Sequence, residues 1–248
     1  MITLISGDSW SVGEWKNSQT GGIIQHAGLA QYLHDHGHHV INVGQSSSSN
    51  RESVLRLNSF FFNNQHLLSG SELQVVVFQT EWIRDFAYMD KEDEDYYNQP
   101  AALIHRLISR FYYDLSALAE RYKVKCYLIG GAGDALVIDD FSTIYRGVEV
   151  VCQSMVNLLV NGQDTTQDPV FALWSYTNKG EDFLKLFKKH ATQEDQANAL
   201  LDEITKGQDR TEVLYKNPEL FYPDGTHPNR HAHRLLFDFL QQHQRIVI

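Results

Sequence analysis

The sequence is poor in the residues that mark several classes of protein. It has only two cysteines, Cys126 and Cys152, and each lies in an apolar stretch (VKCYLI and EVVCQSM), so we expect buried thiols and no disulfide framework. Basic residues are in the minority, 21 against 31 acidic residues, and the net charge of −10 argues against nucleic acid or an anionic membrane as a partner. No run approaches the roughly 20 apolar residues that span a bilayer.

The amino terminus has no basic region followed by an apolar run, so no signal peptide is expected. The expected location is therefore the cytoplasm, and this leaves room for release by lysis or delivery within a particle. What the chain does contain is 42% hydrophobic and 12% aromatic residues, which is enough for a folded core and argues against disorder as the main state.

Apolar segments of two kinds alternate along the first half of the chain. Short, nearly continuous apolar runs predict strands, and longer segments with helical spacing predict helices. The predicted strands are 1–5, 39–43, 73–78 and 124–129, and the predicted helices are 22–34, 52–62, 101–122 and 231–243. This alternation indicates an α/β fold with a parallel sheet wrapped by helices.

The second half is less regular. Residues 148–160 are apolar and fit either a strand or a helix. Residues 160–217 include charged, helix-favouring sequence between looser segments, so we interpret them as a helical insertion or cap. The chain is then one domain over 1–248, with this insertion inside it.

The two ends of the chain carry the residues of a candidate catalytic site. Ser9 follows the first predicted strand in SGDS, at the strand end where parallel sheets place reactive groups. A serine hydroxyl needs a neighbouring base, and His227 in DGTHPN can supply it. Asp224, three residues earlier, can accept the other ring N–H of that histidine.

GDSWSVG and DGTHPNRHAHRLL resemble the first and last blocks of the SGNH, or GDSL-type, hydrolases, a family of esterases, lipases, thioesterases and carbohydrate deacetylases. The resemblance covers the strand–helix order of 1–130 and the segment from about 220. It implies a three-layer, flavodoxin-like fold, with Ser9 as nucleophile, His227 as general base and Asp224 as its orienting partner. Such a mechanism needs neither a metal nor an organic cofactor.

The family's second block reads Asn-x-Gly-x-x-Gly, and its last glycine donates an N–H to the oxyanion. Here the stretch is NVGQSS, which begins at Asn42 and includes Gly44, and Ser47 stands where that glycine is expected. A backbone N–H survives this change if Ser47 takes the same conformation. We therefore expect the loop from Gly44 to Ser47 to contribute to the oxyanion hole.

The third block of the family reads Gly-x-Asn-Asp, and here the matching stretch is QTEW from Gln79. Glu81 stands in place of the asparagine donor. A carboxylate about 4 Å from an oxyanion would add a repulsion of roughly 4 kcal/mol at an effective dielectric of about 20. Glu81 could be protonated, could turn toward Arg84, or could leave donation to Gln79 or Thr80; we favour a turn toward Arg84 with a neighbour donating.

The segment HDHGHH at 34–39 is rich in imidazole, but it lies where a helix ends and a strand begins, and no carboxylate or cysteine set completes a tetrahedral site. No metal site is therefore predicted. The predicted function is hydrolysis of a carboxylic ester, a small molecule or a glycan, with a short-chain or O-acetyl group. The alternatives are a catalytically impaired binding or structural protein on the same scaffold, and a thioesterase or lipase with residues 160–217 as a lid.

Overall fold

The computed structural model describes residues 1–16, 20–65, 72–88, 100–165, 214–224 and 227–246. Most of the segment predicted as a helical insertion or cap, 160–217, lies outside the described residues, and the single-domain organisation that includes it stays a prediction. Its first residues, 160–165, are described and include the end of a helix, and its last residues, 214–217, are described too.

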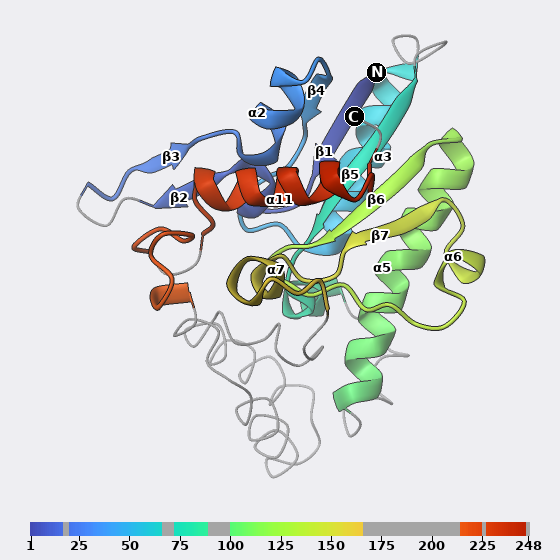
Figure 1. Cartoon of the computed structure of the whole chain (residues 1–248). Helices are drawn as coiled ribbons and strands as arrows, with labels where there is room; N and C mark the ends of the chain where they lie inside the picture. The colour runs from blue at the N-terminus through green and yellow to red at the C-terminus, as the bar shows by residue number, and fades with distance from the viewer. Residues whose placement is uncertain (17–19, 66–71, 89–99, 166–213, 225–226, 247–248) are drawn as a thin grey trace.

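A five-stranded parallel sheet forms the centre of the fold (Figure 1). Its strands are β1 (Ile2–Ser6), β4 (His39–Asn42), β5 (Leu73–Gln79), β6 (Lys125–Gly130) and β7 (Val148–Cys152). Their spatial order is β4-β1-β5-β6-β7, and every neighbouring pair is parallel. This is the flavodoxin-like order of a doubly wound sheet, in which the crossovers change direction between the first strand and its neighbour. The predicted α/β fold class is confirmed.

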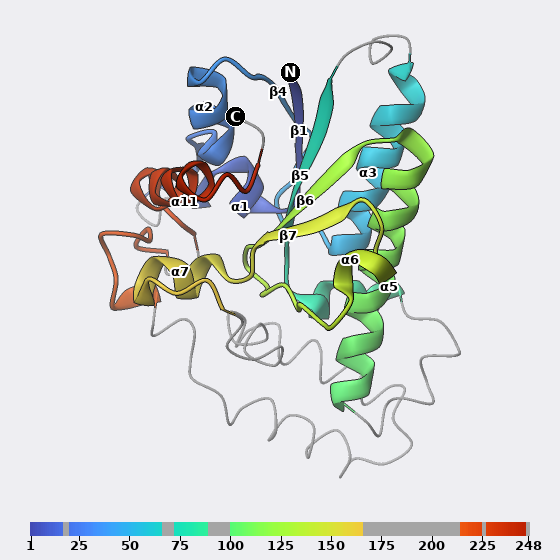
Figure 2. The ribbon, with the colours of Figure 1, turned by 45° about the vertical axis from the view of Figure 1, so that its right-hand side comes forward.

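Helices cover both faces of the sheet (Figure 2). One face carries α3 (Asn50–Asn63), α5 (Pro100–Tyr122) and the short α6 (Phe141–Ile144). The other carries α1 (Ser9–Val12), α2 (Gly28–Asp35), α7 (Met155–Asn161) and α11 (Arg230–Gln242). Successive residues of a strand point to opposite faces, so Leu4 packs in the core under α3 and α5, whereas Ile5 packs in the core under α2 and α11.

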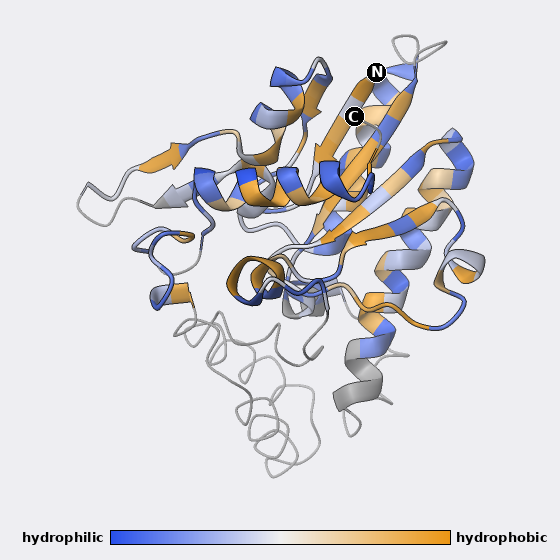
Figure 3. Cartoon of the chain, viewed as in Figure 1, coloured by the Kyte–Doolittle hydropathy of each residue, from blue (hydrophilic) through white to orange (hydrophobic). Residues whose placement is uncertain are grey.

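The strands are apolar along most of their length (Figure 3), as expected for a sheet covered on both sides. Cys126 on β6 and Cys152 on β7 are fully buried and free, as predicted, and burial raises the pKa of both thiols. Within the part of the chain that the structure describes, no helix combines the length and the apolar character needed to cross a membrane.

The helix predicted at 22–34 is wrong in its first part. Residues Ile23–Gln25 form β3, which pairs with β2 (Glu14–Lys16) in an antiparallel hairpin that projects from the sheet (Figure 1). Helix α2 begins only at Gly28, because Ala27 and Gly28 both have positive φ angles, 62° and 50°, which a continuous helix cannot accommodate. Residues 148–160, left open between strand and helix, contain one of each, β7 and the start of α7.

The last helix packs one of its faces into the core. Its buried residues are Ala232, His233, Leu236, Phe237 and Leu240. Leu235, an apolar residue of the same helix, is 37% exposed. The helix starts where the pattern predicts, because the Asn229 side chain accepts a hydrogen bond from the Ala232 N–H and caps it.

Candidate active site

Ser9 lies at the first position of α1, directly beyond the carboxyl end of β1. The strand stops there because Gly7 has a φ of +144°, and a Cβ on it would approach Phe78 to 2.9 Å. Asp8 then caps α1, and its Oδ1 accepts a hydrogen bond of 3.0 Å from the Trp10 N–H. The Gly-Asp-Ser turn therefore presents the hydroxyl of Ser9 at the edge of the sheet.

The structure brings Ser9, Asp224 and His227 together. The Nε2 atom of His227 lies 2.9 Å from the Oγ atom of Ser9, and its Nδ1 atom lies 2.7 Å from Oδ2 of Asp224. The other oxygen of Asp224 accepts a 3.2 Å hydrogen bond from the His227 backbone N–H. With Nδ1–H donated to the carboxylate, Nε2 is left as an acceptor for the serine hydroxyl proton.

Backbone hydrogen bonds close the turn that carries Asp224 and His227. The Tyr222 N–H donates to the His227 carbonyl at 2.9 Å, and Phe221 forms an isolated antiparallel bridge with Pro228. The Asn229 N–H donates to the Leu220 carbonyl at 2.8 Å. These bonds tie the turn to the start of α11 and fix the position of the imidazole relative to that helix.

The loop after β4 packs against the Ser9 turn. The Gln45 N–H donates to the Gly7 carbonyl at 3.0 Å, and a Cβ on Gly44 would overlap the Ser11 hydroxyl. The Gly44 N–H is already donated to the Asn42 side chain at 2.9 Å. Ser47 has a φ of 62°, so it takes the left-handed conformation that favours glycine.

Two backbone N–H groups near this loop, those of Ser9 and Ser47, are available as hydrogen-bond donors. Among the described residues, neither the N–H of Ser9 nor that of Ser47 has a hydrogen-bond partner. Of the loop residues that we expected to contribute, Gly44 has its N–H occupied and serves close packing, whereas Ser47 keeps the N–H that the family's glycine supplies.

Glu81 turns toward Arg84, as we predicted. The Nε atom of Arg84 donates to Oε2 of Glu81 at 2.7 Å, and Nη2 of Arg84 lies 3.8 Å from Oδ2 of Asp8. The hydroxyl of Thr80 lies between the two carboxyl groups, 2.9 Å from Asp8 Oδ2 and 2.7 Å from Glu81 Oε2. Its single proton can be donated to only one of them.

This cluster is buried immediately behind the Ser9 turn. Asp8 and Thr80 have no exposed surface and Glu81 has almost none. Burial raises the pKa of Asp8, the guanidinium of Arg84 opposes this effect, and the charge of Glu81 adds to it. Arg84 is therefore the positive group in direct contact with both of these closely spaced carboxyl groups.

Gln79 and Thr80 are held in the same buried layer. The Gln79 amide donates to the Asp134 carbonyl at 2.7 Å, and its oxygen accepts from the Tyr112 hydroxyl at 3.0 Å. The Thr80 N–H donates to the Asn50 side chain at 2.8 Å. Their contribution to an oxyanion hole stays a prediction, and the bonds above hold both side chains in interior positions.

Comparisons with known proteins give different results by sequence and by structure. No family model and no curated protein sequence matches the chain. Solved structures do match the chain. They are SGNH or GDSL-type esterases and hydrolases. The psychrotrophic esterase EstA from Pseudoalteromonas sp. is 12% identical over 97% of this chain and 94% of its own, with a TM-score of 0.44.

Two further structures show the same range of similarity. Est24, a carbohydrate acetylesterase from Sinorhizobium meliloti, is 14% identical over 98% of both chains, with a TM-score of 0.35. An SGNH-hydrolase-type protein from Slackia heliotrinireducens is 14% identical over 98% of this chain and 97% of its own, with a TM-score of 0.39. The description of the second of these names the family that the two terminal motifs resemble.

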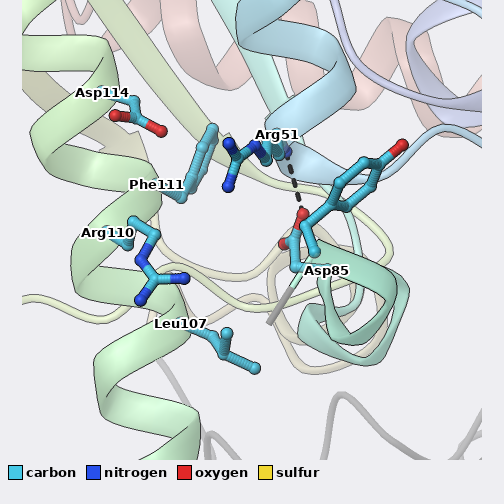
Figure 4. Close-up of a pocket in the computed structure, with 7 residues that line it drawn as sticks. Arg51, Asp85, Leu107, Arg110, Phe111 and Asp114 are labelled. Carbon is cyan, nitrogen blue, oxygen red and sulfur yellow. Dashed lines mark hydrogen bonds between the residues drawn. The ribbon is translucent and has the colours of Figure 1, made fainter. Parts of the chain in front are cut away.

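A separate pocket lies between α3, α5 and the 3₁₀ helix η1 (Trp82–Tyr88) (Figure 4). It is lined by Arg51, Asp85, Tyr88, Leu107, Arg110, Phe111 and Asp114. Asp85 accepts a 2.9 Å hydrogen bond from the Arg51 N–H, the dashed line in the figure, and burial raises its pKa to about 6. The pocket includes none of Ser9, Asp224 and His227, so it is distinct from the candidate active site.

The histidine-rich segment behaves as a helix end, as predicted. His34 lies in the last turn of α2, His36 follows that helix, and His39 opens β4. In the described ranges, no group of three or more histidine, cysteine, aspartate or glutamate side chains is arranged to hold a metal ion. The residue that sequence reasoning missed is His26, which we had placed inside a helix; its contacts connect it to both halves of the site.

Proposed function

We propose that this protein is a serine hydrolase of carboxylic esters. The observation that carries the proposal is the continuous hydrogen-bond chain from Ser9 through His227 to Asp224, with contacts of 2.9 and 2.7 Å. A serine that donates to an imidazole, which in turn donates to a carboxylate, is the arrangement that activates a hydroxyl near neutral pH.

In the proposed reaction, Ser9 Oγ attacks the ester carbonyl while His227 Nε2 takes the hydroxyl proton. Asp224 stays ionised and stabilises the imidazolium that forms. The N–H groups of Ser9 and Ser47 donate to the oxyanion, and each such donor contributes about 2.7–4 kcal/mol in enzymes where one has been removed. His227 then protonates the leaving alcohol, and water repeats the sequence on the acyl-enzyme.

The substrate we propose is a short-chain ester or an O-acetylated carbohydrate. An aromatic pair supports a sugar: Trp15 on β2 stacks on Tyr222, with ring centroids 4.3 Å apart and an interplanar angle of 8°. Tyr222 precedes Asp224 by two residues, so the pair lies beside the turn that carries the base. The C–H faces of a sugar ring pack on such aromatic surfaces.

The test is hydrolysis of p-nitrophenyl acetate together with labelling by a fluorophosphonate. Ser9→Ala should lower kcat by on the order of 10⁶ and abolish labelling, because the nucleophile is lost. Ser11→Ala is the matched control: Ser11 lies on the same short helix, its hydroxyl donates to the Asp8 carbonyl, and its loss should leave labelling in place.

Labelling of another residue, or of none, would overturn the proposal. That result would favour the second candidate, a binding protein on a hydrolase scaffold. The observation behind it is the third block, where a carboxylate replaces the expected amide and the neighbouring side chains are held in the interior.

A further inference from the structure

His26 lies between β3 and α2 and is only 6% exposed. It was not among the predicted site residues. Its backbone and its side chain make contacts in two directions, one toward the helix that carries Ser9 and one toward the turn that carries His227.

The backbone of His26 is attached to the end of the nucleophile's helix. Its N–H donates a short 2.7 Å hydrogen bond to the carbonyl of Gly13, the residue that ends α1. Gly13 and Gly28 are also in direct backbone contact, since a Cβ on Gly13 would overlap the Gly28 nitrogen. Residues 26–28 are therefore held against the end of α1.

The side chain of His26 is attached to the base's turn. Its Nε2 atom lies 3.3 Å from the carbonyl oxygen of Pro228, the residue after His227. Its Nδ1 atom accepts a hydrogen bond of 3.3 Å from the Gly28 N–H. Because a backbone N–H only donates, Nδ1 must be the unprotonated nitrogen, and Nε2 carries the proton that is donated to Pro228.

The surroundings keep this imidazole neutral. Burial lowers the pKa of His26, the bond to the Pro228 carbonyl opposes this, and the charges of Arg230 and His227 lower it further. Two aromatic rings face the imidazole. The distance between ring centroids is 5.6 Å to Tyr222 and 5.3 Å to His233. His233 is itself fully buried, which lowers its pKa to about 3, so it adds no charge.

We propose that His26 is a positioning residue that holds the His227 turn against the Ser9 helix. Its neutral Nε2–H tautomer fixes the Pro228 carbonyl, while its backbone fixes the end of α1. The distance of 2.9 Å between Ser9 Oγ and His227 Nε2 then depends on a residue outside the Ser9–His227–Asp224 hydrogen-bond chain. The kinetic part of this inference rests on the proposed function.

The test compares His26→Phe, which keeps a ring but loses the donor, with His26→Gln, which restores an amide N–H for Pro228. His38→Phe is the matched control: His38 is also 6% exposed and also makes a buried hydrogen bond, 2.9 Å to the Thr3 hydroxyl, and it lies at the amino-terminal end of the strands, opposite to the end that carries Ser9. All variants are compared by thermal unfolding midpoint, by kcat and KM for p-nitrophenyl acetate, and by proton NMR of the His227 Nδ1–H.

We expect His26→Phe to lower kcat by about 10- to 100-fold with little change in KM, since small misplacements of a reacting group cost rate. His26→Gln should recover most of this loss, and His38→Phe should lower the unfolding midpoint while keeping kcat. The low-field Nδ1–H resonance of His227 should shift or broaden in His26→Phe and not in His38→Phe.

A wild-type kcat in His26→Phe, or a loss no larger than in His38→Phe, would overturn the inference. The NMR measurement does not depend on hydrolysis. If the wild type is inactive and unlabelled, the proposed function fails, and an unchanged His227 resonance in His26→Phe still decides against His26 as a positioning residue. A changed resonance in that case supports the positioning role without the function.

Discussion

Replacement of Arg84 by methionine is the sharpest test of the buried cluster behind Ser9. Methionine keeps much of the length of the side chain and removes the guanidinium. Two carboxyl groups, those of Asp8 and Glu81, then remain in the interior beside a single hydroxyl, that of Thr80. The substitution leaves Ser9, His227 and Asp224 unchanged, so its effect is measured by the free energy of unfolding and needs no activity assay.

The magnitude follows from the two short contacts of the guanidinium. At an effective dielectric of about 20, separations of 2.7 Å to Glu81 and 3.8 Å to Asp8 correspond to attractions of about 6 and about 4 kcal/mol. Release of the guanidinium from burial offsets a large part of this. Breaking a buried ion pair by removing one partner typically costs about 3–5 kcal/mol of the free energy of unfolding, and we expect Arg84→Met to fall in that range at pH 8.

The loss of unfolding free energy in Arg84→Met should depend on pH. Burial already raises the pKa of Asp8 above its ordinary value, and removing Arg84 removes the largest of the effects that oppose this. The folded state then holds a proton to higher pH than the unfolded state does, so the stability of the variant falls as pH rises. Arg84→Met should therefore lose less stability at pH 5 than at pH 8.

Urea unfolding followed by circular dichroism measures both effects. The double variant Glu81→Gln/Arg84→Met removes one carboxylate together with the guanidinium and should recover at least about 1 kcal/mol relative to Arg84→Met alone. A loss under about 1 kcal/mol in Arg84→Met at pH 8, or no recovery in the double variant, would refute the reasoning that a charge deficit in this cluster is costly.

Three further outcomes follow from single side chains. Asp224→Asn should lower kcat by ~10⁴, because an amide can hold His227 in the wrong tautomer; the fluorophosphonate labelling rate checks this, and a rate near that of the wild type would contradict it. The pKa of Asp85 is raised to about 6, so between pH 4 and pH 7 the wild type should lose about 2 kcal/mol of stability relative to Asp85→Asn, and an equal difference between the two proteins at both pH values would contradict this. Tyr112→Phe deletes two buried hydrogen bonds and should cost about 1–3 kcal/mol, against under about 0.5 kcal/mol for Tyr113→Phe, whose side chain is 56% exposed.

Prediction from the sequence succeeded where a local pattern is decisive. The apolar runs of β5 and β6 are continuous because both faces of the sheet are covered, and such runs identify strands without further context. The start of α11 was also predicted to within one residue, and in the structure Asn229 caps it through its own side chain.

Prediction failed where the local structure depends on a residue that is distant in the sequence. Residues Ile23–Gln25 have exposed side chains, and their strand exists because Trp15 and its neighbours pair with them. The same holds for His26: in the sequence it is one histidine in a segment with helical spacing. Its function in the fold comes from a carbonyl 202 positions away, so no pattern around residue 26 could have indicated it.

The sequence by itself determined the strands, most of the helices, the sharp turn at Gly7 and the residue types of the candidate site, because these depend on propensities and spacings within a few residues. The tertiary structure alone decided that His227 comes within 2.9 Å of Ser9 across 218 positions, that the hydroxyl of Thr80 lies between Asp8 and Glu81, and which nitrogen of His26 carries the proton. Those are matters of packing and of hydrogen-bond partners, and a partner is defined only once the chain has folded around it.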